Sequence, residues 1–234
     1  MNDSIQRFSL KQRVEHVLAM GVFTVLCVSG LPQKFYTAGW AEALVGAFGG
    51  IDRMRLVHRA AGTALAASTV LHFASALLAV SSRRIPLRMI PTRKDFGDAV
   101  GTLRYYLGAS SVHPKFDRFD YRQKFEYWGL VMGNMVMIST GFLLLFPVAA
   151  TRIVPGVALA AARIAHSNEG LLAFFVISVW HVYNAVLAPE VFPLDTSIFT
   201  GRISRERMEH EHPLELARLE AANEELSLSA ASDG

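Results

Sequence analysis

The stretch HRAAGTALAASTVLH, residues 58–72, is an apolar segment with a histidine at each end. The fourteen residues from His58 to His72 advance about 21 Å along an α-helix and complete nearly four turns, so both rings face the same side. A second stretch, HSNEGLLAFFVISVWH, residues 166–181, repeats the arrangement with one additional residue between its histidines. That residue overshoots by about one helical position, a drift that a bundle helix can absorb. Ionisable side chains in apolar segments are costly, so these histidines are functional candidates.

Both stretches belong to a set of four apolar segments, each near the roughly 20 residues that cross about 30 Å of hydrocarbon. The segments run from about Val14 to Leu31, Val57 to Val80, Phe125 to Phe146 and Gly170 to Leu187. We expect them to be closed by Pro32, by the run from Ser81 to Arg84, by Pro147 and by Pro189, with His166 to Glu169 at the mouth of the fourth. The pattern predicts an all-α integral membrane protein.

The composition agrees with this class. Of the 234 residues, 52% are hydrophobic and 18% are charged, against roughly 25% charged in an average soluble domain. The apolar content excludes a disordered chain, and the single cysteine excludes both a disulfide scaffold and covalent c-type haem attachment. The formal net charge of +3 has a simple cause in basic residues beside membrane spans, without nucleic acid as a partner.

Basic residues near the span ends predict the orientation. Ten of them lie between the second and third spans, from Arg83 to Lys124, and others lie in the two tails. We therefore expect both termini and this link on the cytoplasmic side of the membrane. Residues 1–205 are predicted to form the four-span domain and residues 206–234 a solvated, cytoplasmic helical tail. The amphipathic segment Asp95–Leu107 is expected in the membrane interface.

The second and fourth spans run in the same direction, so their histidines are expected at two levels. His58 should lie level with His166 near the outer face, and His72 level with His181 near the inner face. Two level pairs of imidazoles about 20 Å apart fit two bis-histidine haems better than a small metal ion, whose ligands would cluster in one layer. His16, in the first span, competes with His72 for the inner level.

Glycines indicate an internal repeat. In each half of the chain, a glycine follows the outer histidine by four residues, and a hydroxyl–glycine pair lies near the end of the preceding span. These positions are Gly62, Gly170, Ser29-Gly30 and Thr140-Gly141. A flat macrocycle can lie against backbone that carries no side chain. The repeat predicts a pseudo-symmetric four-helix bundle, built by duplication of a two-helix unit, that holds its cofactor in the core.

The motifs, in this order, resemble the cytochrome b (gamma) subunit of membrane-bound formate dehydrogenases, within the bacterial cytochrome b561 and hydrogenase cytochrome b group. The resemblance covers nearly the whole chain. The motifs that carry it are Arg13-x-x-His16, Ser29-Gly30, His58-x3-Gly62, Asp120-Tyr121-Arg122-Gln123-Lys124, Thr140-Gly141, His166-x3-Gly170, His181 and the ending from Gly201 to Pro213.

The resemblance implies a bundle in a bacterial inner membrane, with two haems b as cofactors and with histidines as axial ligands of the iron. The outer haem would be held by His58 and His166, and the inner haem by His16 and His181. Helix geometry favours His72 instead of His16 as the partner of His181. The histidine left over could bind quinone, a haem propionate or a third haem.

The resemblance further implies a quinone site on the cytoplasmic side, at Asp120, Gln123 and Lys124. Asp120 stands where the family has an asparagine, and a carboxylate there could handle protons. The remaining histidines, His113, His210 and His212, lie in polar segments and are expected to face solvent.

The hypothesis is that electrons pass between a periplasmic iron–sulfur or cytochrome subunit and the membrane quinone pool, through the outer haem and then the inner haem. No substrate-dehydrogenase motif is visible, so a partner subunit should carry the substrate site. One alternative is a haem-free transporter or anchor that uses the histidines for metal ions or helix contacts. Another is a stand-alone b561-like protein that transfers electrons without a quinone.

Overall fold

The computed structural model describes residues 4–82 and 87–232. Within these ranges, four helices are long and apolar enough to cross a membrane, which confirms the predicted fold class. They are α1 (Leu10–Lys34), α3 (Ile51–Ser81), α5 (Tyr121–Leu145) and α7 (Gly156–Phe175), the last continued by the π-helical segments η1 (Val176–His181) and η2 (Tyr183–Leu187). The other elements are β1 (Ser4–Gln6), α2 (Gly39–Ala47), α4 (Arg93–Tyr106), α6 (Pro147–Ala150), α8 (Ser197–Thr200), β2 (Arg202–Ser204), α9 (Arg205–Glu211) and α10 (Pro213–Ser232).

The chain divides into two compact units. The first, here called the membrane unit, comprises residues 10–84 and 129–195. The second, here called the terminal unit, comprises residues 1–9, 85–128 and 196–234, and therefore brings both tails together with the link between α3 and α5.

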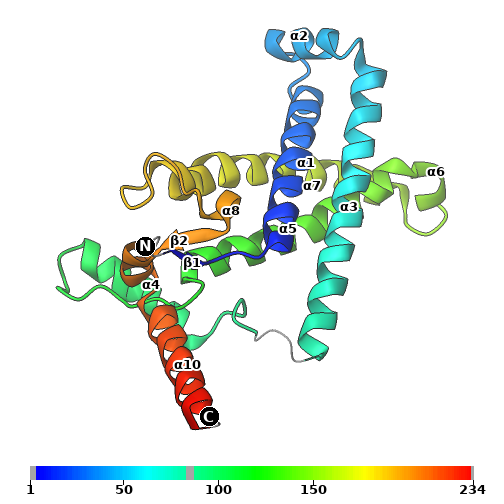
Figure 1. The fold of residues 1–234 in the computed structure, drawn as a ribbon. Coiled ribbons are helices and arrows are strands. Elements are labelled where there is room, and N and C mark those ends of the chain that lie inside the picture. The colour runs from blue at the N-terminus through cyan, green and yellow to red at the C-terminus, as the bar shows by residue number, and fades with distance from the viewer. Residues whose placement is uncertain (1–3, 83–86, 233–234) are drawn as a thin grey trace. The chain divides into compact units, whose positions relative to one another are not determined.

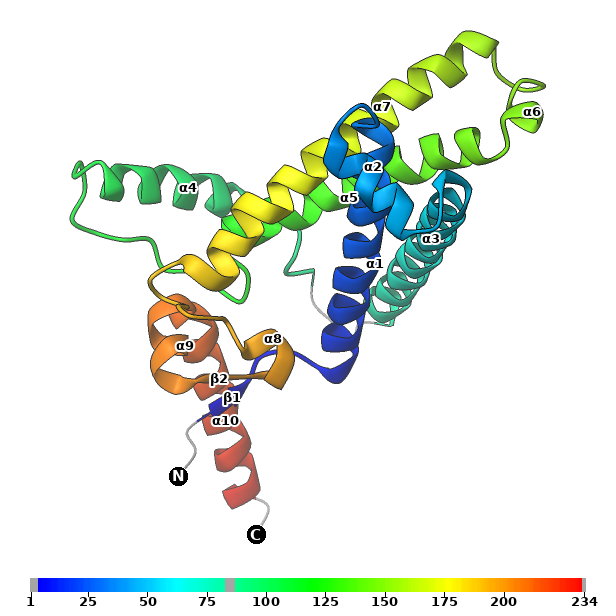
Figure 2. The ribbon, with the colours of Figure 1, turned by 90° about the horizontal axis from the view of Figure 1, so that it is seen from above.

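In the membrane unit, α1 and α3 lie side by side and are joined through α2 (Figure 1). Gly49 and Gly50 have φ angles of 78° and 110°, which an L side chain rarely adopts, and they reverse the chain between α2 and α3. Helix α7 passes beside α1, and α6 lies between α5 and α7 (Figure 2). Large apolar side chains such as Leu71, Met132 and Leu172 are exposed along the spans, as helices that face lipid require.

Two predicted helix ends are wrong. Helix α1 continues through Pro32 to Lys34, with the proline inside its last turn. The fourth helix begins at Gly156 instead of near Gly170, because the preceding segment is rich in alanine, the best helix former. His166 and the polar residues after it therefore lie inside the helix and not at its mouth. Arg83 and Arg84, predicted to close the second span, lie outside the described residues.

The terminal unit has a small core of its own. Strands β1 and β2 pair antiparallel, with Ile5 opposite Ile203. Ile5 packs against the buried side chains of Ile203, Met208 and Leu216. The tail is helical as predicted, but the side chains of Met208 in α9 and Leu216 in α10 are buried in this core instead of solvated.

Helix α4 confirms the helix expected over Asp95–Leu107. Thr92 and Asp95 form a capping box at its start, in which each residue satisfies a backbone donor of the other. The side chains of Phe96 and Leu107 are 72% and 73% exposed. Its place in the membrane interface stays a prediction.

Candidate functional site

The two histidines predicted at the outer level, here called the outer histidines, come together between the two halves of the membrane unit. His58 lies on α3 and His166 on α7, and their ring centres are 6.3 Å apart with the ring planes nearly perpendicular. Both side chains are half-buried. The level pairing that the sequence predicts at the outer end is therefore present in the structure.

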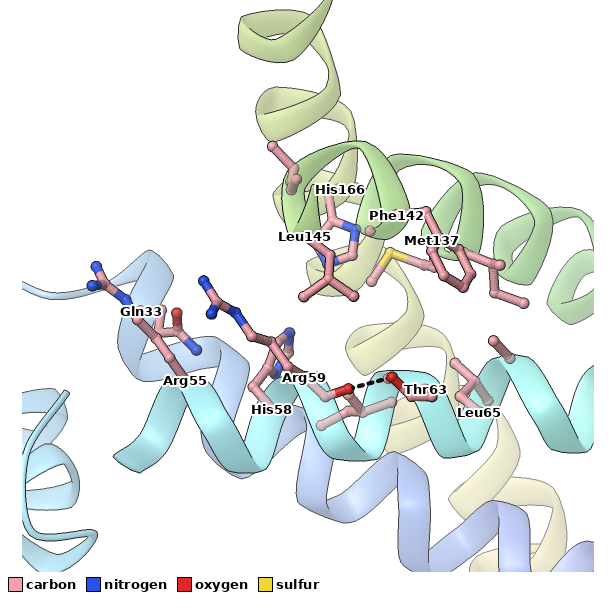
Figure 3. A pocket seen from close by; sticks show the side chains of 16 residues that line it. Gln33, Arg55, His58, Arg59, Thr63, Leu65, Met137, Phe142, Leu145 and His166 are labelled. Atoms are coloured by element: carbon pink, nitrogen blue, oxygen red, sulfur yellow. Dashed lines mark hydrogen bonds between the residues drawn. The ribbon is translucent and has the colours of Figure 1, made fainter. Parts of the chain in front are cut away.

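A cavity lies beside this pair (Figure 3). The cavity is open on one side, and its empty volume, including the part at the opening, is about 970 Å³. Both histidines line it. Most of its wall is apolar and comes from α3 and α5, with Leu65, Met137 and Phe142 among the lining residues. The predicted glycines Gly62 and Gly141 also line it, so backbone is exposed to the cavity at both positions.

Two arginine side chains also line this cavity. Arg55 and Arg59, one turn apart on α3, extend to the same side of the helix as Gln33 of α1 (Figure 3). Arg55 also lies 3.8 Å from Asp52 through its Nη1 atom, an exposed pair of small energetic weight. Arginines in this place can bind carboxylates of a ligand held in the cavity.

A hydroxyl holds each outer histidine. Ser29 Oγ lies 3.0 Å from His58 Nδ1, and Thr140 Oγ1 lies 2.9 Å from His166 Nδ1. The sequence indicated both hydroxyl–glycine pairs, but a role was predicted only for their glycines and none for the hydroxyls. The signal was available, since a hydroxyl residue directly precedes the glycine in both halves.

The adjoining glycines allow this approach. A Cβ atom on Gly30 would lie 2.9 Å from His58 Cε1, and one on Gly141 would lie 3.3 Å from His166 Cε1. Gly62 has no neighbour within 4 Å of such an atom, while Gly170 would meet Met137 Cε at 3.5 Å. Gly30 and Gly141 therefore make room for the histidine rings, whereas Gly62 leaves open space.

At the inner level, the structure brings His16 and His181 together. Their ring centres are 6.0 Å apart, with 35° between the ring planes. His72 instead contacts Glu15, with His72 Nδ1 3.1 Å from Glu15 Oε2. Lys11 lies 3.6 Å from Glu15 and donates a hydrogen bond to Ser75 Oγ, one turn beyond His72. The ring pairing at this level is therefore the one that the family resemblance implies.

The additional residue between His166 and His181 is accommodated by a change of helix type. The segment that leads into His181 is π-helical, with hydrogen bonds from residue i to i+5. A π turn contains more residues than an α turn, so fifteen residues here rotate about as far as fourteen in a regular α-helix. Both histidines consequently keep the same face of the fourth span.

The separation of both pairs suits one metal ion between the two rings. A metal–imidazole bond is about 2.0–2.1 Å long, and the ring centre lies roughly 1.1 Å behind the bonded nitrogen. Imidazoles on opposite sides of one iron therefore have ring centres about 6.3 Å apart. The distances of 6.3 Å and 6.0 Å agree with this value. The residues thus fit axial ligation of haem iron.

The residues predicted for quinone binding have structural contacts in the terminal unit. Asp120 Oδ1 accepts from the backbone N–H of Gln123 at 2.8 Å, and Gln123 Oε1 accepts from that of Asp120 at 3.2 Å, a reciprocal cap at the start of α5. Lys124 Nζ contacts Asp95 Oδ1 and Oδ2 at 2.8 and 2.9 Å in a buried pair. Burial opposes ionisation of Asp95, but the hydrogen bonds from Lys124 and Thr92 hold its pKa below the usual value.

His212 was predicted to face solvent, and this is wrong. Its side chain is 4% exposed, and it contacts the backbone oxygen of Asp117 through Nδ1 at 2.7 Å and Arg7 Nη2 through Nε2 at 3.0 Å. Burial, together with the charge of Arg7, lowers the pKa of His212 to about 4. The neutral ring therefore donates to Asp117 and accepts from Arg7. His113 and His210 are exposed, as predicted.

A charge cluster surrounds His212. Arg7 and Arg118 contact the two oxygens of the buried Glu215 carboxylate, each at 2.6 Å. Arg218 donates two hydrogen bonds to Asp117, and these lower the pKa of Asp117 to about 2. The cluster joins the N-terminal segment, the link before α5 and the C-terminal tail.

Comparison with known proteins gives one family. The sequence model of the family described as prokaryotic cytochrome b561 matches residues 7–201, which include all five histidines discussed for the membrane unit. No curated protein is significantly similar to the chain in sequence.

Proposed function

Because the chain belongs to the prokaryotic cytochrome b561 family, and so is a haem b electron-transfer protein of a bacterial membrane, we propose a finer function for it. It carries two haems b, one at each histidine pair, and passes electrons across the membrane between a periplasmic redox partner and the quinone pool. The observation that carries the proposal is the presence of two histidine pairs with ring centres 6.3 Å and 6.0 Å apart.

The two pairs have separate roles. His58 and His166 bind the outer haem, next to the apolar cavity that Arg55 and Arg59 border. His16 and His181 bind the inner haem. The rise of about 1.5 Å per helical residue separates the two levels by about 20 Å along the fourth span. Each haem supplies a one-electron iron centre, whose potential depends on the axial imidazoles and their surroundings.

The quinone end of the proposal rests on the family resemblance. Asp120, Gln123 and Lys124 would bind the headgroup on the cytoplasmic side. Their side chains already take part in the cap of α5 and in the pair with Asp95, so a quinone that binds here exchanges at least one of these hydrogen bonds. Both termini would lie on this same side of the membrane, as the distribution of basic residues indicates.

The partner would be a periplasmic iron–sulfur or cytochrome subunit, as in the formate dehydrogenases whose gamma subunit the chain resembles. That partner would carry the substrate site.

The experiment is a haem count by pyridine haemochrome on the purified, detergent-solubilised chain, with reduced-minus-oxidised spectra. Two b haems per chain are expected, and one each in His58→Ala and His181→Ala. His113→Ala, which changes an exposed histidine of the terminal unit, should keep both. One haem in the unmodified chain would contradict the two-haem proposal. Two haems that quinol fails to reduce would instead favour transfer without a quinone.

A further inference from the structure

The two outer histidines have the same surroundings, built once by each half of the repeat. In the first half, Ser29-Gly30 of α1 faces His58 of α3. In the second half, Thr140-Gly141 of α5 faces His166 of α7. Each of the two histidines that would bind this haem therefore has a hydroxyl oxygen next to its Nδ1 atom.

The direction of these hydrogen bonds follows from the second contact of each hydroxyl. Ser29 Oγ donates to the carbonyl oxygen of Val25 at 2.6 Å, and Thr140 Oγ1 donates to that of Val136 at 2.5 Å. A hydroxyl has a single proton, so toward the histidine each one can only accept. The proton of both imidazoles therefore lies on Nδ1, and the lone pair of Nε2 is available to a metal ion.

The hydroxyls are held firmly in place. Ser29 is fully buried, and its bond to Val25 fixes the side chain against its own helix. Gly30 lets the His58 ring approach to a distance at which a Cβ atom would already clash. The serine, the glycine and the ring therefore define one orientation of His58, and Thr140 with Gly141 does the same for His166 with slightly more room.

We propose that Ser29 and Thr140 are positioning residues that set the midpoint potential of the outer haem through the Nδ1 protons of its two axial histidines. The inference rests on the proposed function, since it requires a haem between His58 and His166. When an oxygen atom accepts a hydrogen bond from Nδ1–H, the imidazole becomes a stronger electron donor to the iron. Stronger donation stabilises the oxidised metal. A neutral hydroxyl does this to a smaller degree than a carboxylate.

The chain contains the contrasting case. Glu15 precedes Ser29 by fourteen residues on α1, and His72 follows His58 by fourteen on α3, so the two contacts occupy equivalent places along the same helix pair. There the partner of the histidine is a carboxylate, and the structure pairs His181 with His16 instead. Thus the two histidines that contact a hydroxyl pair with each other, whereas His72, which contacts a carboxylate, does not pair with His181.

The test is a potentiometric titration of both haems in the solubilised chain with Ser29→Ala or Thr140→Val. Loss of the acceptor weakens the imidazole as a donor, so one of the two midpoint potentials should rise. The expected size is a threefold to tenfold change in the redox equilibrium, up to about 59 mV for one electron. Ser29→Thr and Thr140→Ser retain a hydroxyl and should restore the original value.

Thr63 provides the matched control. It lines the same cavity, and its hydroxyl donates to the carbonyl of Arg59 at 2.9 Å in the same manner (Figure 3). Thr63→Val therefore removes an equivalent hydroxyl from the cavity wall without changing Ser29 or Thr140. Potentials of Ser29→Ala and Thr140→Val that equal those of Thr63→Val would overturn the inference.

A second measurement covers variants that lose haem. In the unmodified oxidised chain, electron–nuclear double resonance should detect an exchangeable proton on the remote nitrogen of both outer imidazoles. Absence of these protons would overturn the inference without any substitution. If the unmodified chain bound no haem at the outer pair, the proposed function would fail instead, so the two failures are distinguishable.

Discussion

The two units surround their buried and half-buried histidines with different kinds of partner. In the membrane unit, His58 and His166 face neutral hydroxyls, and each hydroxyl bonds in turn to a backbone carbonyl. In the terminal unit, His212 lies among full charges, next to Arg7 and close to Glu215. Hydrocarbon offers no water to compensate an ion, so neutral partners suit the first unit. Buried ions are acceptable in the second because each has a counter-ion and hydrogen bonds.

The inner level of the membrane unit lies between these extremes. His16 and His181 face each other, while Glu15 brings a carboxylate to His72 and is itself near Lys11. Hydroxyl partners at the outer histidines, mixed partners at the inner level and full charges around His212 lead to separate predictions for haem content and for stability.

The largest effect is expected at the inner level. His16→Ala should reduce the haem count from two to one per chain, because its ring lies opposite His181. His72→Ala should leave two, because its ring contacts Glu15. A pyridine haemochrome count on both variants tests this. Two haems in His16→Ala and one in His72→Ala would show that helix spacing, and not the ring pairing, identifies the ligand.

The second prediction breaks the charged cluster. Glu215→Gln leaves Arg7 and Arg118 facing a neutral amide, and loss of one partner from a buried ion pair costs about 3–5 kcal/mol. Hydrogen exchange in the full chain should show β1, β2 and α9 opening more often, with the haem count unchanged. Glu220→Gln, on the same helix and paired with Arg205 at the surface, should have little effect. Equal exchange in both variants would show that the cluster contributes no stability.

The third prediction concerns pH. The pKa of His212 is about 4 in the folded chain, against an ordinary value of 6.5. The unfolded unit therefore binds more protons between these values, so the stability that the neutral ring contributes is complete above about pH 6.5 and decreases as the pH falls toward 4. The full change over these values corresponds to about 3 kcal/mol, at about 1.36 kcal/mol for each pH unit. Asp117, with a pKa of about 2, adds a separate loss only below about pH 4.

Hydrogen exchange of α9, corrected for intrinsic rates, measures this dependence between pH 6.5 and 4.5. His212→Asn has no titrating ring and should flatten the profile, whereas His210→Asn, at an exposed position on the same segment, should leave it unchanged. A profile in His212→Asn as steep as in the unmodified chain would assign the dependence to another group.

Sequence was sufficient for the features that repeat or extend over a whole helix. The four apolar segments predicted four spans, and the common direction of the second and fourth spans predicted that His58 and His166 would pair. The inner level was ambiguous because the repeat is imperfect there. Glu15-His16 in the first half corresponds to Glu126-Tyr127 in the second, so three histidines remained for two positions. Helix spacing favoured His72 as the partner of His181, whereas the structure places the ring of His16 there.

The terminal unit could not be predicted, for a different reason. Its contacts join residues such as Arg7 and Glu215 that are about two hundred positions apart, and such pairings leave no local periodicity. A buried arginine or glutamate has the same appearance in a sequence as a solvated one. The tail and His212 were therefore assigned to solvent, although the structure buries both Glu215 and His212.

The smallest effect is expected from the fit between helix and ring at the outer level. Alanine is favoured over glycine in a helix by about 1 kcal/mol, so a harmless Gly→Ala change should stabilise α1 slightly. Gly21→Ala meets this condition, since its Cβ has no neighbour within 4 Å. Gly30→Ala places a Cβ 2.9 Å from His58 Cε1, so the ring must shift and the bond to Ser29 must lengthen. Partial loss of the outer haem is therefore expected in Gly30→Ala, a smaller loss in Gly141→Ala at 3.3 Å, and none in Gly21→Ala. Equal haem content in all three variants would mean that His58 and His166 tolerate displacement. The hydroxyl partners alone, and not the close approach of Gly30 and Gly141, would then distinguish the outer histidines from the charged cluster around His212.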